Sequence, residues 1–125
     1  MRNRQAAATW LLHRREADPA IRVAIIAAGE RWRDGSLRPA IEDLWGVGAL
    51  VAALAARGWT GISLEARAAA AAFNSVADGI GPALQCCASG QELAGLGYPE
   101  DVDTAAQLDR SHAVPVLEGE AFVPR

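Results

Sequence analysis

An uncharged apolar run from Val23 to Ala28 is the feature that most constrains how this chain can fold. Gly29 follows the run, and no charged residue interrupts it. A short run of this kind is typical of a strand that is buried on both faces of an α/β sheet. We therefore expect residues 23–28 to form a central strand. The mostly polar residues 29–38 should then form a loop at its carboxyl end, where open α/β sheets usually bind ligands.

A longer apolar segment, from Ile41 to Ala56, predicts a helix directly after this loop. Pro39 is expected in the first helical turn, where its missing N–H group costs nothing, and Gly58 is expected as the residue that ends the helix. The helix is apolar almost all round, so both of its sides need cover. Gly46 and Gly48 each cost about 1 kcal/mol against alanine in a helix interior, which indicates close approach of a neighbouring element.

The rest of the chain is predicted to be mainly helical, with a short β hairpin near its end. The predicted helices are residues 3–15, 64–77, 89–96 and 99–108, and the two β-like runs are residues 114–117 and 121–123. Ser63 is a candidate N-cap, and Ser89 with Glu92 three residues later has the spacing of a capping box. One strong strand and several apolar helices require a wider sheet between them. We therefore expect an α/β fold in which residues 1–125 form a single partial layered domain with few strands and alanine-rich helices.

Composition restricts the classes of partner. The chain carries 12 arginines and no lysine, its net charge is −3, and it has no basic run, so nucleic acid and anionic membranes are poor candidates. No stretch has the length of a membrane span and the amino terminus lacks the apolar core of a secretory signal, so we expect a cytoplasmic protein. Cys86 and Cys87 are adjacent, which is not the C-x-x-C spacing of zinc or redox sites, so we expect buried free thiols.

Carboxylates and guanidinium groups converge on the predicted loop and on the start of the helix after it. Mg²⁺ prefers oxygen ligands and commonly takes only one or two carboxylates, with water and substrate phosphate filling the octahedron. Glu30, Glu42 and Asp43 are the candidate metal ligands. Neighbouring helix positions differ by about 100° in direction, so Glu42 and Asp43 should not both face one point. The candidate residues for binding a substrate anion are Arg31, Arg33 and Arg38.

From these residues alone, a simpler explanation is preferred. The same charges are explained as solvated loop residues whose ion pairs contribute about 0–1 kcal/mol each. Acids also occur at Glu100, Asp101 and Asp103, but carboxylates in a first helical turn ordinarily complement the helix dipole.

Five segments, taken together, resemble one known family in order and spacing. They are MRNRQAAATWL, AAGERWRDGSLRPAIEDLWGVGALVAAL, SLEARAAAAAF, CCASGQELAGLGYPEDVDTAAQLD and VPVLEGEAF, and they span nearly the whole chain. The family is that of the 2-phosphosulfolactate phosphatases (ComB-like), and the resemblance is to its carboxyl-terminal half. The amino-terminal half of the family carries an Asp-Val-Leu-Arg-Ala-Ser type segment and an Asn-Ser-Pro type segment, and neither occurs here. The resemblance therefore implies that this chain begins near the family's midpoint.

The resemblance implies a Mg²⁺-dependent hydrolase. Members of the family remove phosphate from 2-phospho-3-sulfolactate and give sulfolactate, on the way to coenzyme M or in related sulfonate metabolism. In that case Glu30 and Asp43 are expected to be catalytic, and Glu42 joins them in holding the metal. Such hydrolysis depends mostly on positioning and charge neutralisation. The three candidate arginines then have a sulfonate and a carboxylate to bind.

The alternative from a different functional class is a non-catalytic α/β fragment that serves as an assembly or binding partner. A central strand with few neighbours leaves backbone groups unpaired, and a helix with no polar face leaves apolar surface exposed unless another layer covers it. We therefore expect the chain to form a homo-oligomer or to bind a complementary amino-terminal half.

Overall fold

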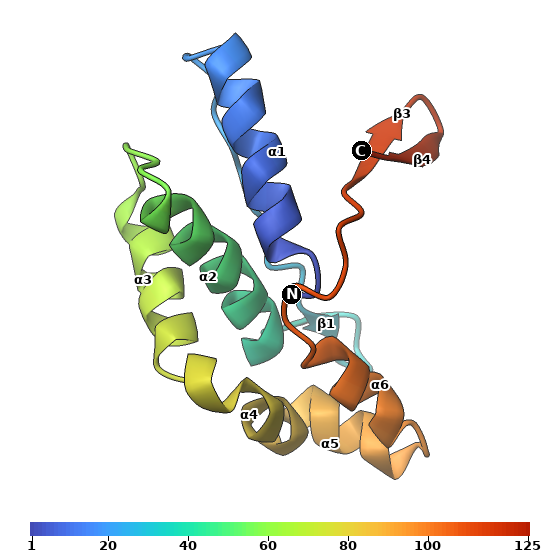
Figure 1. The fold of residues 1–125 in the computed structure, drawn as a ribbon. Helices are drawn as coiled ribbons and strands as arrows, with labels where there is room; N and C mark the ends of the chain where they lie inside the picture. Colours follow the sequence, from blue (N-terminus) through green and yellow to red (C-terminus); the bar gives the residue numbers. More distant parts are fainter.

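Helices make up most of the structure, a computed structural model that describes residues 1–125 (Figure 1). The helices are α1 (Arg4–Ala17), α2 (Ile41–Ala56), α3 (Leu64–Asn74), α4 (Ile80–Cys86), α5 (Ala88–Gly95) and α6 (Pro99–Ala105), with a 3-10 turn at Ala77–Gly79. Two antiparallel pairs of strands complete the fold: β1 (Glu30–Arg31) with β2 (Leu37–Arg38), and β3 (Pro115–Glu118) with β4 (Ala121–Pro124). The expected mixed α/β class is confirmed. None of the helices is both long enough and apolar enough to cross a membrane.

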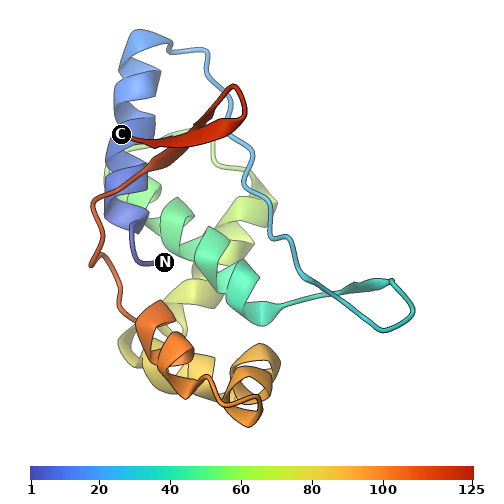
Figure 2. The same cartoon turned by 90° about the vertical axis from the view of Figure 1, so that its right-hand side faces the viewer.

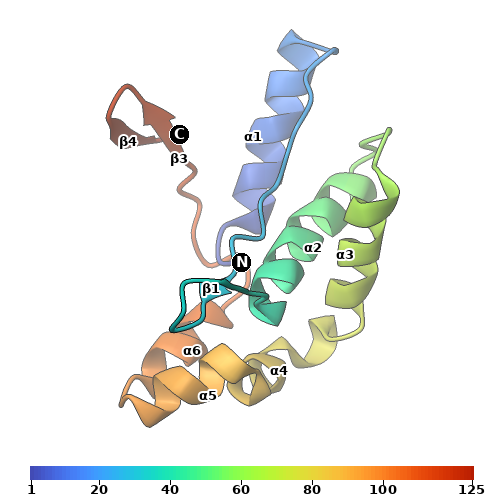
Figure 3. The same cartoon turned by 180° about the vertical axis from the view of Figure 1, so that it is seen from behind.

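Residues 23–28 do not form the predicted central strand. The segment runs back along α1 (Figure 3), but none of the backbone N–H and C=O groups of residues 22–28 takes part in a hydrogen bond. The prediction was wrong because an apolar run reflects a preference of side chains for burial, whereas a strand also needs a neighbouring strand to pair with its backbone. The predicted loop is a hairpin instead, because Glu30 pairs with Arg38 across β1 and β2.

Helix α2 has the predicted bounds and the predicted carboxyl-terminal cap. Gly58 has a φ of +81°, and its N–H donates to the carbonyl of Ala55 at 3.0 Å while the N–H of Trp59 donates to the carbonyl of Leu54 at 3.0 Å. These are the two hydrogen bonds of a Schellman motif, which satisfies carbonyls that the helix itself leaves free. Pro39 lies outside the helix, before its N-cap residue, so its predicted place in the first turn is wrong.

Both sides of the apolar helix α2 are covered, as predicted. Helix α3 lies on one side and α1 on the other (Figure 1). The close approach of α3 depends on Gly48, because a Cβ at this position would lie 2.0 Å from the carbonyl oxygen of Ala69. A Cβ at Gly46 would meet nothing within 4 Å, so the same prediction is wrong for Gly46.

Two clusters of buried side chains hold the helices together. The first joins α2 and α3 to the short helices and consists of Ala49, Phe73, Ile80, Leu84 and Val102. The second joins α1 to α2 and consists of Ala8, Ala53 and Leu54. Alanines supply two of the three residues of the second cluster, which lets α1 and α2 approach closely.

The helix starts after α2 are only partly as predicted. Ser63 is the N-cap of α3, and its hydroxyl accepts a hydrogen bond from the N–H of Ala66 at 3.2 Å. Ser89 does not form the predicted capping box, because the N-cap of α5 is Cys87, whose sulfur accepts from the N–H of Gly90 at 3.4 Å. Helices α3 and α6 end before the predicted residues 77 and 108. The carboxyl-terminal hairpin β3–β4 is confirmed.

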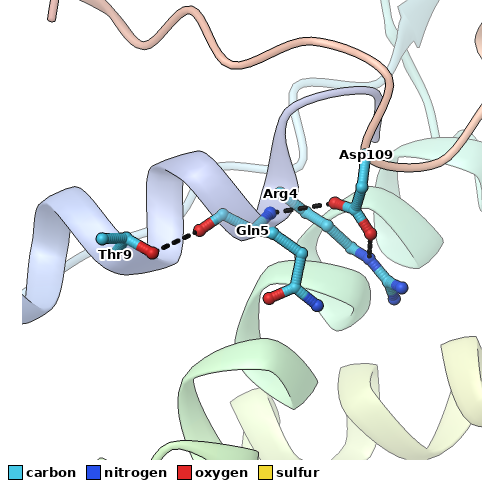
Figure 4. A network of polar contacts seen from close by, with 4 residues as sticks. All are labelled: Arg4, Gln5, Thr9 and Asp109. Carbon is cyan, nitrogen blue, oxygen red and sulfur yellow. Dashed lines mark hydrogen bonds and ion pairs between the residues drawn. The ribbon is translucent and has the colours of Figure 1, made fainter.

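Asp109, in the segment after α6, fixes the amino-terminal end of α1 (Figure 4). One carboxylate oxygen accepts from the Nε of Arg4 at 2.8 Å, and the other accepts from the backbone N–H of Gln5 at 2.9 Å. A helix start has free N–H groups and a positive partial charge, so a carboxylate is favoured there. Asp109 has a φ of +56°, a conformation that asparagine and aspartate tolerate better than other non-glycine residues.

Replacing Asp109 should therefore loosen α1. Asp109→Ala removes both hydrogen bonds and leaves an unsuitable residue at positive φ, so we expect the free energy of unfolding to fall by about 1–2 kcal/mol, the usual range for a lost cap. Asp109→Asn should cost less, because its amide oxygen still accepts from Gln5. Urea unfolding followed by circular dichroism measures both values, and equal stability of the two variants would contradict this role.

Candidate functional site

A cavity of about 530 Å³ lies between the start of α1, the first half of α2 and the short helices α4 to α6. Carboxylates from three separate parts of the chain line it. Glu30 comes from β1, Glu42 and Asp43 come from the first turn of α2, and Asp101 comes from the first turn of α6. The structure thus brings the three predicted metal ligands to one cavity and adds a fourth acid that the sequence reading assigned to the helix dipole.

Asp43 connects the hairpin to the helix. One of its carboxylate oxygens accepts a hydrogen bond from the backbone N–H of Gly29 at 2.6 Å. Gly29 has a φ of +71°, and a Cβ there would lie 2.9 Å from the carbonyl oxygen of Arg38, so only glycine fits easily at this point. Asp43 therefore holds the base of the β1–β2 hairpin, which carries Glu30, against the amino-terminal end of α2.

Cys87 lies in the wall of the same cavity, and it is a structural thiol. Burial raises the pKa of the Cys87 thiol above its ordinary value, and the nearby Glu42 carboxylate raises this pKa further. The protonated sulfur lies 3.1 Å from the carbonyl oxygen of Leu84, to which it donates. A raised pKa disfavours the thiolate, so Cys87 is poorly suited to act as a nucleophile.

The two adjacent cysteines differ in exposure, since Cys86 is exposed and Cys87 is buried. The prediction of two buried free thiols is thus correct for Cys87 and wrong for Cys86.

A thiol reagent should label the exposed Cys86 rapidly in the folded chain and the buried Cys87 only after unfolding. The slow reaction at Cys87 should increase only at a pH above that needed by an ordinary thiol, because the reactive form is the thiolate. Labelling measured by mass spectrometry, with Cys86→Ser as the control, checks this; rapid labelling of both thiols would contradict it.

The chemistry of the cavity suits a hard cation that keeps much of its water. No group of three or more His, Cys, Asp or Glu side chains is arranged to hold a metal ion as a cluster. The oxygen donors that line the cavity nevertheless match the preference of Mg²⁺, which often uses only one or two carboxylates. Glu42 and Asp43 occupy neighbouring helix positions and point in different directions, so Glu30 or Asp101 would have to complete a pair with one of them.

The three candidate arginines lie on the hairpin, which projects from the body beside the cavity (Figure 2). Arg38 makes an ion pair with Glu92 at 2.8 Å, and its guanidinium lies over the ring of Trp32 at 5.4 Å. The Nη1 of Arg31 donates to the carbonyl of Gly35 at 2.8 Å. Arg33 is exposed, and none of the three arginines lines the cavity.

The hairpin turn has its own fixed charge. Asp34 accepts from the hydroxyl of Ser36 at 2.6 Å and from the backbone N–H of Ser36 at 2.9 Å, and these two hydrogen bonds lower the pKa of the Asp34 carboxyl.

Arg4 is the one arginine that lines the cavity, although the sequence analysis did not select it as a candidate. Its place there depends on Asp109, which is more than a hundred residues away in sequence, so no local pattern pointed to it.

Comparison with known proteins adds one finding to this geometry. No solved structure matches this chain. The sequence profile of the family described as 2-phosphosulpholactate phosphatase matches residues 1–120 of the 125 residues. The match takes in the carboxylates that line the cavity, the hairpin and all six helices. The chain therefore belongs to the 2-phosphosulpholactate phosphatase family.

Proposed function

We propose that this chain is a Mg²⁺-dependent phosphatase that hydrolyses 2-phospho-3-sulfolactate, or a similar small anionic phosphoester, to sulfolactate and phosphate. The observation that carries the proposal is the cavity where Glu30, Glu42 and Asp43 meet in a chain of this family. The chain acts there alone or together with a complementary amino-terminal half.

Each acid has a distinct part in this proposal. Glu30 and Asp43 would supply oxygen ligands to the metal, Asp43 through its second carboxylate oxygen while its first accepts the N–H of Gly29, and Glu42 would complement the positive end of α2. A bound Mg²⁺ would neutralise the phosphate charge that grows during hydrolysis. Glu30 lies on the hairpin strand, opposite the helix start, and there it orients the attacking water and accepts its proton.

The anionic groups of the substrate require cations. The hairpin holds Arg31, Arg33 and Arg38 beside the cavity, and guanidinium groups bind sulfonate, carboxylate and phosphate through paired hydrogen bonds. Arg33 is exposed, and Arg38 already has a carboxylate partner in Glu92. We therefore propose Arg33 as the first contact with the substrate and Arg38 as a support for the hairpin that also reaches the anion.

Phosphate release from 2-phospho-3-sulfolactate tests the proposal directly. The rate is measured with Mg²⁺, with a chelator, and with a simple phosphomonoester that lacks the sulfonate. The chain is assayed by itself and together with the amino-terminal half of a complete family member. Release that depends on Mg²⁺ and prefers the sulfonated ester supports the proposal. If phosphate release does not depend on Mg²⁺ either for the chain alone or for the chain with the amino-terminal half, the proposal is overturned and the binding-partner alternative is favoured.

The metal ligands are tested by binding as well as by activity. Glu30→Gln and Asp43→Asn should each weaken Mg²⁺ binding at least tenfold, since changes even to residues that only orient metal ligands cost about 10- to 100-fold, whereas Glu42→Gln should weaken it less. The fold should persist in all three, because the amide oxygen of Asp43→Asn still accepts from Gly29. Isothermal titration calorimetry with Mg²⁺ alone provides the readout, with Glu16→Gln, an exposed acid in α1, as the control. A variant with an unchanged binding isotherm removes that residue from the site.

A further inference from the structure

Residues 22–28 are unusual because they combine apolar side chains with a backbone that has no partner. None of their N–H or C=O groups makes a hydrogen bond within the chain. Residues 23–28 contain no charge and no proline, and Ile26 is 84% exposed. A row of free donors and acceptors along an exposed apolar segment is a template for pairing with another strand.

The segment touches the helices at only a few positions, and the residues between them, including Val23 and Ala27, are exposed. Ile21, Ile25 and Gly29 are half-buried, whereas all the even positions from 22 to 30 are exposed. Ile25 lines both the large cavity and a second cavity between the segment, α2 and the start of α3. The segment therefore rests on the helices through Ile21 and Ile25 while most of its residues stay exposed, so a partner strand would add to a supported edge.

We propose that two copies of this chain associate by antiparallel pairing of residues 22–30, with a two-fold axis through Ile26. In this register Ile26 lies opposite the partner's Ile26, and Ala24 lies opposite the partner's Ala28. Arg22 lies opposite the partner's Glu30, and the symmetry repeats this pair at the other end. All of these residues are exposed. The segment is thus complementary to itself, with an apolar centre and opposite charges at both ends.

The charges select this register over its neighbours. A shift by two residues in either direction places Glu30 opposite an alanine, either Ala20 or Ala24, and separates the two isoleucines at position 26. A shift by one residue places Arg22 opposite the partner's Arg31 or Gly29, so it also removes the pair between Arg22 and Glu30. The association does not depend on the proposed catalytic activity, and it is measured without substrate or metal.

Changes of charge at the exposed residues of the segment test the pairing. The unchanged chain should sediment as a monomer–dimer equilibrium between micromolar and millimolar concentration. Ile26→Lys places two cations opposite each other at the centre and should abolish the dimer. Leu64→Lys is the matched control, since Leu64 is 75% exposed on α3 and should leave the equilibrium unchanged. A monomeric unchanged chain, a dimer that tolerates Ile26→Lys, or an equal loss in Leu64→Lys would each overturn the proposal.

The register is tested by exchanging the end charges. Arg22→Glu sets like charges opposite each other twice, and it should raise the dissociation constant of the dimer by about tenfold. The double change Arg22→Glu with Glu30→Arg restores opposite charges in the same register and should return the dissociation constant close to its original value. Failure of the double variant to recover, with folding verified by circular dichroism, would overturn the proposed register. Open-ended aggregation instead of a closed dimer would overturn the two-fold symmetry.

Discussion

Gly48→Ala should lower the free energy of unfolding by about 1–3 kcal/mol or more. The added Cβ would lie 2.0 Å from the carbonyl oxygen of Ala69 and 2.8 Å from the Cβ of Phe73. The first of these atoms belongs to the backbone of α3, so no rotation of a side chain can make room. The two helices must separate, and separation weakens the largest buried cluster of the chain.

Gly46→Ala is the matched control for this change. Gly46 lies two residues earlier in α2, where a new Cβ would meet nothing within 4 Å. Alanine is favoured over glycine in a helix interior by about 1 kcal/mol, so this variant should be more stable than the original chain. Chemical unfolding followed by circular dichroism compares the three proteins. A similar shift of the unfolding midpoint in both variants would contradict the close contact at Gly48.

Phe73→Ala should lower the free energy of unfolding by about 3–5 kcal/mol, the usual cost of truncating a buried phenylalanine. Phe73 is 2% exposed and belongs to the cluster that joins α2 and α3 to the short helices. Its ring also lies beneath the guanidinium of Arg4, at 5.2 Å from ring centre to Cζ, so the change removes a contact with α1 as well.

The carboxyl-terminal hairpin provides the control for Phe73→Ala. Phe122 lies in β4 and is 70% exposed, so Phe122→Ala removes an aromatic ring from the surface. We expect a change of less than about 0.5 kcal/mol, as is usual for surface positions. Thermal unfolding should therefore separate the two phenylalanine variants by many degrees. A comparable loss in both would show that the cluster around Phe73 does not dominate the stability of the fold.

The proposed binding of Mg²⁺ involves the same helix, α2, that holds the largest buried cluster. The same helix supplies Glu42 and Asp43 from its first turn and Gly48 from its middle. A ligand that binds only the folded chain stabilises it, so Mg²⁺ should raise the midpoint of thermal unfolding if the proposed site is correct. The variant Asp43→Asn should lose most of that rise.

The features that the sequence alone determined are local. The bounds of α2, the Schellman cap at Gly58, the N-cap at Ser63 and the β3–β4 hairpin all follow from contacts between residues a few positions apart. The family and the carboxylates of the candidate site were also readable from the sequence. Glu30 lies near the start of α2 because the local β1–β2 hairpin between them folds the chain back, so their acids line one cavity.

Tertiary structure decided everything that depends on a distant partner. The apolar run 23–28 suited a strand, but no second strand lies beside it, and the run remains unpaired. Glu92 had the spacing of a capping box, yet it pairs with Arg38, which is 54 residues away. Asp101 and Arg4 reach the cavity because α6 and the start of α1 pack against α2. Local propensities are encoded within one turn of a helix or one pair of residues, whereas pairing and burial are set by which segments the whole chain brings together.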